Sequence, residues 1–490
     1  MGGNANLSTT QGDITLTASN IAAQGDVTMH AAGDLTIQSG QDTAGNANVS
    51  DNKAIGTVVI SDTERFSGYH TEKHRDDNAT VTQVASSVGS LGGNVNLSAG
   101  GTYTQSASNV VAAKDVDVTA ASIQLLTAND SHAASSQDDT LKIGAFARVK
   151  SPLIDLINNV DAARNSDGRL SAMQGMAAVA NGYQAASAIS SMAGGAGSGA
   201  GSGALVSVEA GMGYATSTEK YKAGSQTAQG STISGGGNVS LTSTSGDLTI
   251  ESLQDTSNIQ SKESGYGGRI QVSFGTAWDA SGYASTAKAN GTSTGVTEQS
   301  GLFAGKGGYH VDAGNVNLIG GAIASTNADN SDLTANSLTF SDLQNRMGYS
   351  ASSGSLAGGF GYSGTPATDA NGNPVAVSAG DQAKNIGSNI ANGNYGAANS
   401  GGLGGGLPMS QSGNDSTTTR ATLTEGNITI GGKRTTAAET GINTDASKAN
   451  EALATLPDVR KVLAEQQAMG AAAGPDGLLG QLRQSRWRVR

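Results

Sequence analysis

The residues in this chain best suited to metal chemistry are its five histidines, since the sequence has no cysteine. His70 and His74 are four residues apart, a spacing that on a helix would place two imidazole ligands on one face. The segment around them, 67–77, is polar without a helical pattern, and no third ligand stands nearby. Because a histidine pair alone does not hold a metal ion, we predict no metal site there. The same holds for the other histidines, which are His30, His132 and His310.

Three glycine-rich segments resemble ligand-binding loops only in part. Residues 359–364 (Gly-Phe-Gly-Tyr-Ser-Gly) match a dinucleotide pattern but lie in low-complexity sequence without a strand–helix context. Residues 431–433 (Gly-Gly-Lys) lack the spacing and the following Ser or Thr of a phosphate loop. Residues 305–312 resemble one calcium-binding nonapeptide, whereas such sites need stacked copies. No serine in a nucleophile-elbow context has a paired histidine. We therefore predict no catalytic residues, no cofactor-binding residues and no enzyme activity.

The composition favours a thin-cored, repetitive protein. The 490 residues include 71 glycines, with 4% aromatic and 14% charged residues, which is low for a compact enzyme. A net charge of −12 argues against nucleic-acid binding, and the basic cluster at residues 483–490 is interpreted as a solvated tail. No signal peptide follows Met1, and the most apolar stretch, 173–205, is too interrupted to span a membrane.

A five-residue unit organises the chain: Gly, then Asn or Asp, then apolar, polar and apolar residues. Gly next to Asn or Asp favours a turn, and the alternation that follows favours a short strand with one buried face. Each unit therefore predicts a turn followed by a strand. Copies begin at Gly3, Gly12, Gly25, Gly33, Gly93, Gly237, Gly246, Gly314 and Gly426, with a glycine-less variant at Lys114.

The spacing of alternate units predicts a parallel β-helix. Asn4 of one unit is followed by Asp26 two units later, and Asn94 is followed by Asp115 at nearly the same interval. A return after about 21 residues is typical of one solenoid coil, so Asn4 is expected to stack on Asp26. An antiparallel sandwich explains the alternation but not the return. The stacked Asn and Asp residues are expected to form a hydrogen-bonded ladder, which we favour over calcium binding.

Repeat blocks alternate with other segments. We assign residues 1–150 and 231–349 to β-helix repeats, although residues 43–91 are polar and irregular apart from a strand-like run at 55–60. Residues 151–192 carry apolar residues at helical spacing on both sides of a polar break. This pattern predicts a helical hairpin inserted in the β array.

The remaining segments lack regular repeats. Residues 193–230 are expected to form a Gly-rich linker and a strand, and residues 350–420 a flexible low-complexity segment. Residues 421–490 form a tail in which 446–468 predict a helix that is interrupted and restarts at Pro457. The expected fold is thus mainly β: a parallel β-helix, or solenoid, with an inserted helical hairpin and a partly helical, low-complexity C-terminal tail.

Several motifs occur together along this array. They include Gly-Asn-Val-Asn-Leu at 93–97 and 314–318, Gly-Leu-Phe-Ala-Gly-Lys at 301–306 and Leu-Thr-Phe-Ser-Asp-Leu-Gln-Asn at 338–345. The series resembles the distal haemagglutinin-repeat region of filamentous haemagglutinins and contact-dependent growth inhibition exoproteins, over about residues 1–465. The resemblance implies a right-handed β-helix and secretion through an outer-membrane two-partner transporter. It also implies display at the bacterial cell surface and an unidentified receptor on a target or host cell.

We do not recognise the secretion domain or the C-terminal toxin of that family, so the chain is expected to be an interior fragment. Solenoids need capping coils, and neither end of the sequence offers one. We therefore expect the open ends to expose strand edges and to self-associate.

The sequence leaves two functions open. The first is a structural or adhesive stalk that mediates cell–cell or host-cell contact, and the second is a delivery region that helps a C-terminal toxin enter target bacteria. A third hypothesis, a β-helical polysaccharide lyase or hydrolase, would require converging carboxylates in a cleft. The acidic residues are instead dispersed among turns, which disfavours this enzyme.

Overall fold

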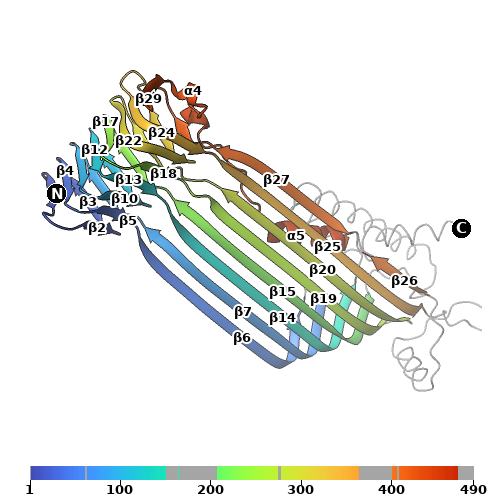
Figure 1. The fold of residues 1–490 in the computed structure, drawn as a ribbon. Helices are drawn as coiled ribbons and strands as arrows, with labels where there is room; N and C mark the ends of the chain where they lie inside the picture. The colour runs from blue at the N-terminus through green and yellow to red at the C-terminus, as the bar shows by residue number, and fades with distance from the viewer. Residues whose placement is uncertain are drawn as a thin grey trace, which may run out of the picture.

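The structure is a computed structural model that describes residues 2–60, 63–150, 164, 207–273, 277–363, 400–405 and 408–472. It consists of a stack of parallel β-coils from which long antiparallel hairpins extend to one side (Figure 1). The helical hairpin predicted for residues 151–192 lies, apart from Arg164, outside the described residues.

Each coil of the stack contributes strands to three faces, and strands on one face pair in parallel with those of the next coil. Ala5 pairs with Val27, its counterpart one coil later, as the repeat spacing predicts. The first face contains β1 (Ala5–Ser8), β4 (Val27–Ala31), β9 (Val95–Ala99), β12 (Val116–Ala120), β17 (Asn238–Ser243), the first halves of β22 (Gly308–Ile319) and β24 (Asp332–Ser341), and β29 (Asn427–Ile430).

The second face is continuous with the first through β22, whose second half pairs with β18. It contains β2 (Ile14–Thr17), β5 (Leu35–Gln38), β10 (Thr102–Ser106), β13 (Ser122–Leu126), β18 (Leu248–Glu251) and the second halves of β22 and β24. The third face contains β3 (Asn20–Ala23), β8 (Ser87–Ser90), β11 (Asn109–Ala112), β16 (Thr232–Gly235), β21 (Gly301–Ala304), β23 (Ala322–Ser325) and β28 (Thr422–Leu423). The prediction of a parallel β-helix is confirmed.

The core of the coils is a column of stacked apolar side chains. Leu7 pairs with Met29 and Met29 with Leu97, so like residues of successive coils lie on one another. Val118, Leu241 and Val311 continue this column from Leu97, and all three are essentially inaccessible to water. The alternation in the five-residue unit is therefore the alternation of inward and outward side chains.

The hairpins leave the coils at one corner, between a second-face strand and a third-face strand. They form a nine-stranded sheet of β6 (Gly40–Val59), β7 (Glu64–Val84), β14 (Ala128–Lys150), β15 (Ser207–Gln229), β19 (Asp255–Ser273), β20 (Ala277–Gly295), β25 (Leu343–Ser363), β26 (Ser400–Gly405) and β27 (Met409–Thr419). Since the hairpin is an insertion, Val27 still pairs with Val95 although the whole of β6 and β7 lies between them in the sequence.

Some coils close directly, without a hairpin, for a geometric reason. A coil advances the stack by one strand spacing of about 4.8 Å, whereas a hairpin adds two strands, or about 9.6 Å, to its own sheet. Hairpins on every coil would therefore outgrow the stack. The connections from β2 to β3, from β10 to β11 and from β22 to β23 are short. The coils that contain these connections add height to the stack without adding strands to the hairpin sheet, which leaves room for the hairpins of the other coils.

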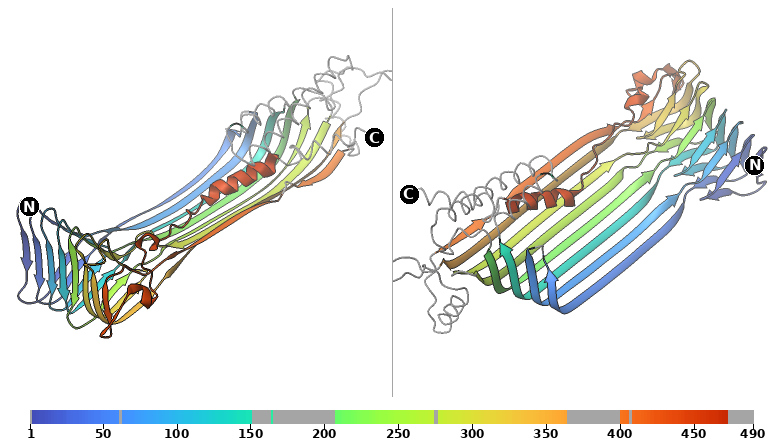
Figure 2. Two further views of the ribbon diagram at one scale, coloured as in Figure 1. Left: turned by 90° about the horizontal axis from the view of Figure 1, so that it is seen from above. Right: turned by 180° about the vertical axis from the view of Figure 1, so that it is seen from behind.

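A row of glycines crosses the hairpin sheet near the end remote from the coils. Gly56, Gly68, Gly144 and Gly213 lie opposite one another on four consecutive strands. An ideal Cβ on Gly144 would lie 2.7 Å from Gly68 Cα, closer than real atoms approach. The strands curve at this end of the sheet (Figure 2), and side-chain-free residues permit the close backbone approach on its inner side.

Helix α5 (Val459–Ala472) packs on one face of the hairpin sheet (Figure 2). Val459 and Leu463 are buried there against Ala287, Ala289 and Ala351. The helix follows Pro457, as predicted, but the residues before it differ from the prediction. Before Pro457 only the 3-10 turn η1 (Ala446–Lys448) is helical, because the chain that follows it lies beside β27, where Asn450 bridges Thr419 and Ala454 N donates to Asp415.

Two predictions about local structure are wrong. Residues 43–91 are not irregular, since most of them form β6, β7 and β8. Residues 350–420 are not one flexible segment, because β25 continues to Ser363 and β26 and β27 follow. Both stretches lack an apolar alternation because large parts of the sheet face solvent, so cross-strand pairing rather than burial defines these strands. The division of the chain into six segments otherwise stays a prediction.

The expectation that neither end of the solenoid is capped is also wrong for the C-terminal end. After β29, the chain turns back in β30 (Lys433–Thr435) and α4 (Ala437–Thr440). Leu423 N donates to Asn443 O, so this returning segment covers the third-face edge at β28. At the other end, β1, β2, β3 and β6 each have a paired strand on one side only among the described residues. Self-association through that end stays a prediction.

Candidate functional surfaces

The Asn and Asp residues of the repeat turns form a ladder that runs from coil to coil. Asn4 Oδ1 accepts from Asp26 N at 2.9 Å, and Asp26 Oδ1 accepts from Asn94 N at 2.8 Å. Asn94 Oδ1 accepts from Asp115 N at 3.1 Å, and Asp115 Oδ1 accepts from Asn238 N at 2.8 Å. The predicted ladder thus exists, with side-chain oxygens bonded to main-chain N–H groups of the next coil.

A second, shorter ladder follows the other turn of the coil. Asp13 Oδ1 accepts from Asp34 N at 2.8 Å, and Asp34 Oδ1 accepts from Thr102 N at 2.7 Å. Each of these bonds satisfies a turn N–H that has no partner within its own coil. The turn residues therefore hold the spacing between coils.

The ladder explains why glycine precedes Asn or Asp in the repeat. A Cβ on Gly93 would overlap Asp26 Oδ1 and would stand 2.8 Å from the carbonyl carbon of Gly25. The oxygen of one coil occupies the space that a side chain of the next coil would need. Glycine is thus required by contact between coils as well as by the turn.

Replacing Asp115 by alanine tests the ladder. We expect the free energy of unfolding to fall by about 1 kcal/mol, because Asn238 N loses its acceptor in a half-buried turn. Thermal and urea unfolding followed by circular dichroism measure the change. The control is Asp117→Ala, which removes the same charge from an exposed position on the neighbouring strand β12. Equal destabilisation by both variants would show that the ladder contributes nothing specific.

The histidine pair singled out by spacing does not converge. His70 and His74 both lie on β7, where four residues span about 13 Å. His70 is buried beside Phe66, with ring centroids 6.3 Å apart. Both ring nitrogens of His74 contact carboxylates, Asp138 at 2.5 Å and Asp76 at 2.7 Å. Within the described residues, no group of three or more His, Asp or Glu side chains is placed to hold a metal ion.

His74 instead links two hairpins, because Asp138 belongs to β14. The hydrogen bond with Asp138, together with the charges of Asp138 and Asp76, raises the pKa of His74 above its ordinary value of 6.5. A raised folded-state pKa contributes stability that is fully present below about pH 6.5 and is lost as the pH rises through the folded-state pKa.

We therefore expect the melting temperature of the chain to fall as the pH rises above 6.5, and His74→Gln to flatten this part of the profile. Asp138→Asn removes the largest cause of the pKa shift and should flatten it similarly. Calorimetry between pH 5.5 and 8.5 makes the comparison. If the change of melting temperature with pH were the same in His74→Gln as in the unmodified chain, His74 would be excluded as the cause of this pH dependence.

The glycine-rich motifs fall in structural contexts that differ from ligand loops. Residues 359–363 lie within the antiparallel strand β25, whereas a dinucleotide loop connects a parallel strand to a helix. Gly431 and Gly432 have positive φ angles of 60° and 73° and form the tight turn between β29 and β30. Residues 305–307 form the turn into β22 and stack on the Gly236–Gly237 turn of the preceding coil, as the other repeat turns do.

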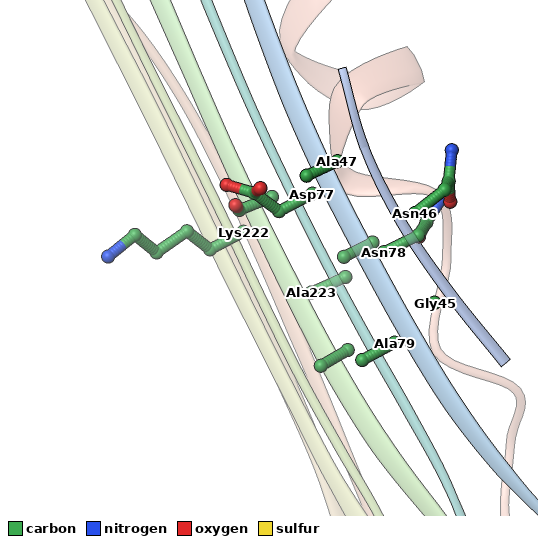
Figure 3. Close-up of a pocket in the computed structure, with 11 residues that line it drawn as sticks. Gly45, Asn46, Ala47, Asp77, Asn78, Ala79, Lys222 and Ala223 are labelled. Carbon is green, nitrogen blue, oxygen red and sulfur yellow. The ribbon is translucent and has the colours of Figure 1, made fainter. Parts of the chain in front are cut away.

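A shallow depression of about 600 Å³ lies on the hairpin sheet, over small side chains of β6, β7, β14 and β15. Its lining includes Gly45, Ala79 and Ala133. Lys222 and Asn46 project from this place to opposite sides of the sheet (Figure 3). The depression is open to solvent and brings no catalytic pair together.

A row of cations that no sequence motif indicates crosses the sheet. Lys220, Lys262 and Lys288 lie directly opposite one another on β15, β19 and β20. All three are exposed on the face opposite α5. Residues so far apart in sequence show no spacing motif, so only the pairing register reveals the row.

The stacked coils, their turn ladders and the attached sheet define a repeat protein of the parallel β-helix class. The family model of the hemagglutinin repeat matches residues 1–140, 66–266 and 222–357. The chain belongs to the hemagglutinin repeat family, in the form found in exoproteins like filamentous haemagglutinin and CdiA. No helix among the described residues is long and apolar enough to cross a membrane.

Several CdiA proteins are similar to this chain. The "tRNA nuclease CdiA-2" of Burkholderia pseudomallei strain 1026b is 27% identical over 94% of the chain and 18% of its own length. Another "tRNA nuclease CdiA" of Burkholderia pseudomallei is 27% identical over 94% of the chain and 43% of its own length. The "Toxin CdiA" of Yersinia pestis is 28% identical over 49% of the chain and 7% of its own length. The chain thus spans less than half of these relatives, and no solved structure matches it.

Proposed function

We propose that the chain is a non-enzymatic structural segment of a secreted bacterial surface exoprotein and that it mediates contact with other cells. The observation that carries the proposal is the unbroken pairing of coils along the first face, from β1 to β29. Such a stack is rigid along its axis, because every coil is bonded to the next through main-chain bonds and a turn ladder. A rigid rod that carries a broad sheet suits the display of a contact surface away from a cell.

The proposal includes a route and a location. The family resemblance supports secretion by an outer-membrane two-partner transporter and exposure at the cell surface. The contact partner is a receptor on a target or host cell whose identity the fold leaves open. The chain itself carries out no reaction in this proposal, because its acidic residues are used in turn ladders and cross-strand pairs.

A second candidate function is toxin delivery. The observation that favours it is the similarity, over 94% of this chain, to relatives named as tRNA nucleases. In this hypothesis, the segment helps a toxin domain carried elsewhere on the exoprotein to enter a target bacterium.

One experiment separates the two functions. Donor bacteria display the exoprotein with or without residues 1–490, and both adhesion to target cells and inhibition of target growth are measured. If deletion abolishes adhesion, the segment acts as the contact stalk. If adhesion persists while inhibition is lost, the segment acts in delivery. Retention of both activities would exclude both functions. Equal surface amounts of the two proteins, measured by antibody labelling of intact cells, are the required control.

A further inference from the structure

The first strand of the hairpin sheet, β6, presents a long open edge (Figure 1). It runs for 20 residues and pairs only with β7 among the described residues. Its register with β7 is constant from Gly40 to Val59, so no bulge interrupts it, and it contains no proline. Unpaired N–H and C=O groups along an edge invite another strand, and natural sheets commonly use prolines, bulges or a covering segment against this. In the described part of the chain, β6 has none of these three.

The opposite side of the same sheet shows such a cover. The chain that follows η1 lies beside β27, where Asn450 bridges Thr419. Further along, Ala454 N donates to an oxygen of Asp415 at 2.8 Å. The protein thus covers part of one edge of the sheet with its own chain, whereas the edge at β6 is open among the described residues.

The hydrogen bonds to β7 show which residues of β6 face the open edge. Ile60 N donates to Glu64 O at 3.0 Å, in the same register that pairs β6 with β7. The backbone groups of successive residues in a strand point to opposite sides, so even-numbered residues bond β7. The odd-numbered residues therefore direct their N–H and C=O groups outward. Among these outward residues, only Asp51 and Lys53 carry a charge.

The outward residues around Asn52 form a self-complementary series. Val49, Asp51, Lys53 and Ile55 share one face of the sheet and are all exposed. Their order is apolar, negative, positive and apolar, so the series matches its own reverse if opposite charges pair. In an antiparallel pair of two copies centred on Asn52, Asp51 of each copy faces Lys53 of the other, and Val49 faces Ile55.

Other registers near this centre lack the match. Outward residues can exchange backbone hydrogen bonds only with outward residues, so the register shifts in steps of two. Centring the pair on Asp51 places two aspartates opposite each other, and centring it on Lys53 places two lysines opposite each other. Like charges directly opposite destabilise a sheet, whereas opposite charges stabilise it. The two charges therefore select the register centred on Asn52.

We propose that two copies of this chain associate edge to edge through residues 49–55 of β6, paired antiparallel about Asn52. The partner is a second copy, because the same segment supplies both halves of the match, as a twofold interface requires. The twofold axis is perpendicular to the sheet, so the two hairpin sheets continue into one another. The proposal goes beyond the contact function above and does not depend on it.

The side chains of the segment gain from this pairing. Val49 is 70% exposed and Ile55 is 84% exposed, and each would cover the other across the interface. Asp51 would lie between Lys73, its cross-strand neighbour in the same chain, and Lys53 of the second copy. Within one chain, Lys53 Nζ lies 3.1 Å from Asp51, an exposed ion pair that contributes little to stability by itself.

The test is sedimentation equilibrium of the purified full chain, for which we expect a concentration-dependent dimer. Asp51→Lys and Lys53→Asp each place like charges opposite one another at two points of the interface. Each should weaken the dimer at least about tenfold. An equal mixture of the two variants restores both ion pairs and should dimerise as the unmodified chain does. The control Asp42→Lys makes the same charge change outside the segment, on the other face of β6, and should change the affinity less than about twofold.

Amide hydrogen exchange locates the contact. Exchange in residues 47–57 should slow as the concentration rises, because the outward N–H groups become bonded, while β1, β2 and β3 should keep their rates. Loss of fold is controlled by the double variant D51K/K53D, which exchanges the two charges within one chain. It should dimerise as the unmodified chain does, which a misfolded strand could not do.

Four results would overturn the proposal. The unmodified chain could remain a monomer at every concentration, which would leave the edge to another occupant. Dimerisation could be unaffected by Asp51→Lys and Lys53→Asp. The mixture of these two variants could fail to recover the affinity, which would reject the register. Finally, exchange could slow in β1, β2 and β3 and not in β6, which would place the contact at the open coil end.

Discussion

Replacing Leu241 by alanine should lower the free energy of unfolding by about 2–5 kcal/mol. Leu241 is 1% exposed and lies between Val118 and Val311 in the column of stacked side chains. The substitution removes apolar contacts with two coils at once and leaves a cavity that the paired backbones on either side cannot close. Urea unfolding followed by circular dichroism gives the change in midpoint.

Leu91→Ala is the matched control for this prediction. Leu91 is 72% exposed at the corner after β8, so the same truncation there should cost no more than about 0.5 kcal/mol. If both substitutions lowered stability by similar amounts, the thin coil core would not be the main source of stability. The comparison therefore measures how much of the stability of this protein comes from stacking of coils.

Replacing Gly68 by alanine should destabilise the chain by about 1–3 kcal/mol. A Cβ there would overlap Ile143 O, would lie 2.7 Å from Gly144 Cα and would press on the ring of Phe66. Backbone atoms on an interior strand cannot move away without breaking the pairing of β7 with β14. The expected effect is a lower unfolding midpoint and faster amide hydrogen exchange at the remote end of the sheet.

Gly56 provides the control, because it lies directly opposite Gly68 on the edge strand β6. Nothing lies within 4 Å of the position of its Cβ, so Gly56→Ala should change stability by less than about 0.5 kcal/mol. Equal tolerance of alanine at both positions would mean that the glycine row does not mark a required close approach.

The two parts of this protein differed in how well they could be predicted. The coils were predictable because Gly-Asn or Gly-Asp turns and alternating apolar residues recur once in every coil, a local pattern that leads directly to Ala5 pairing with Val27. The hairpin sheet was not predictable, since strands such as β6 bury neither face and therefore show no alternation of apolar and polar residues. Its strands are defined by backbone pairing with neighbouring strands, and the amino-acid composition gives little indication of that pairing.

The sequence by itself determined the repeat, the inward column of Leu, Val and Ile, and the stacking of turn Asn and Asp residues. Only the tertiary structure decided that the turn oxygens bond main-chain N–H groups of the next coil, and that glycine is needed because an oxygen fills its side-chain space. It also decided that Lys220, Lys262 and Lys288 form one row. The physical reason is register: side chains on strands far apart in sequence become neighbours only when pairing aligns them, and a shift of one residue would turn each to the other face.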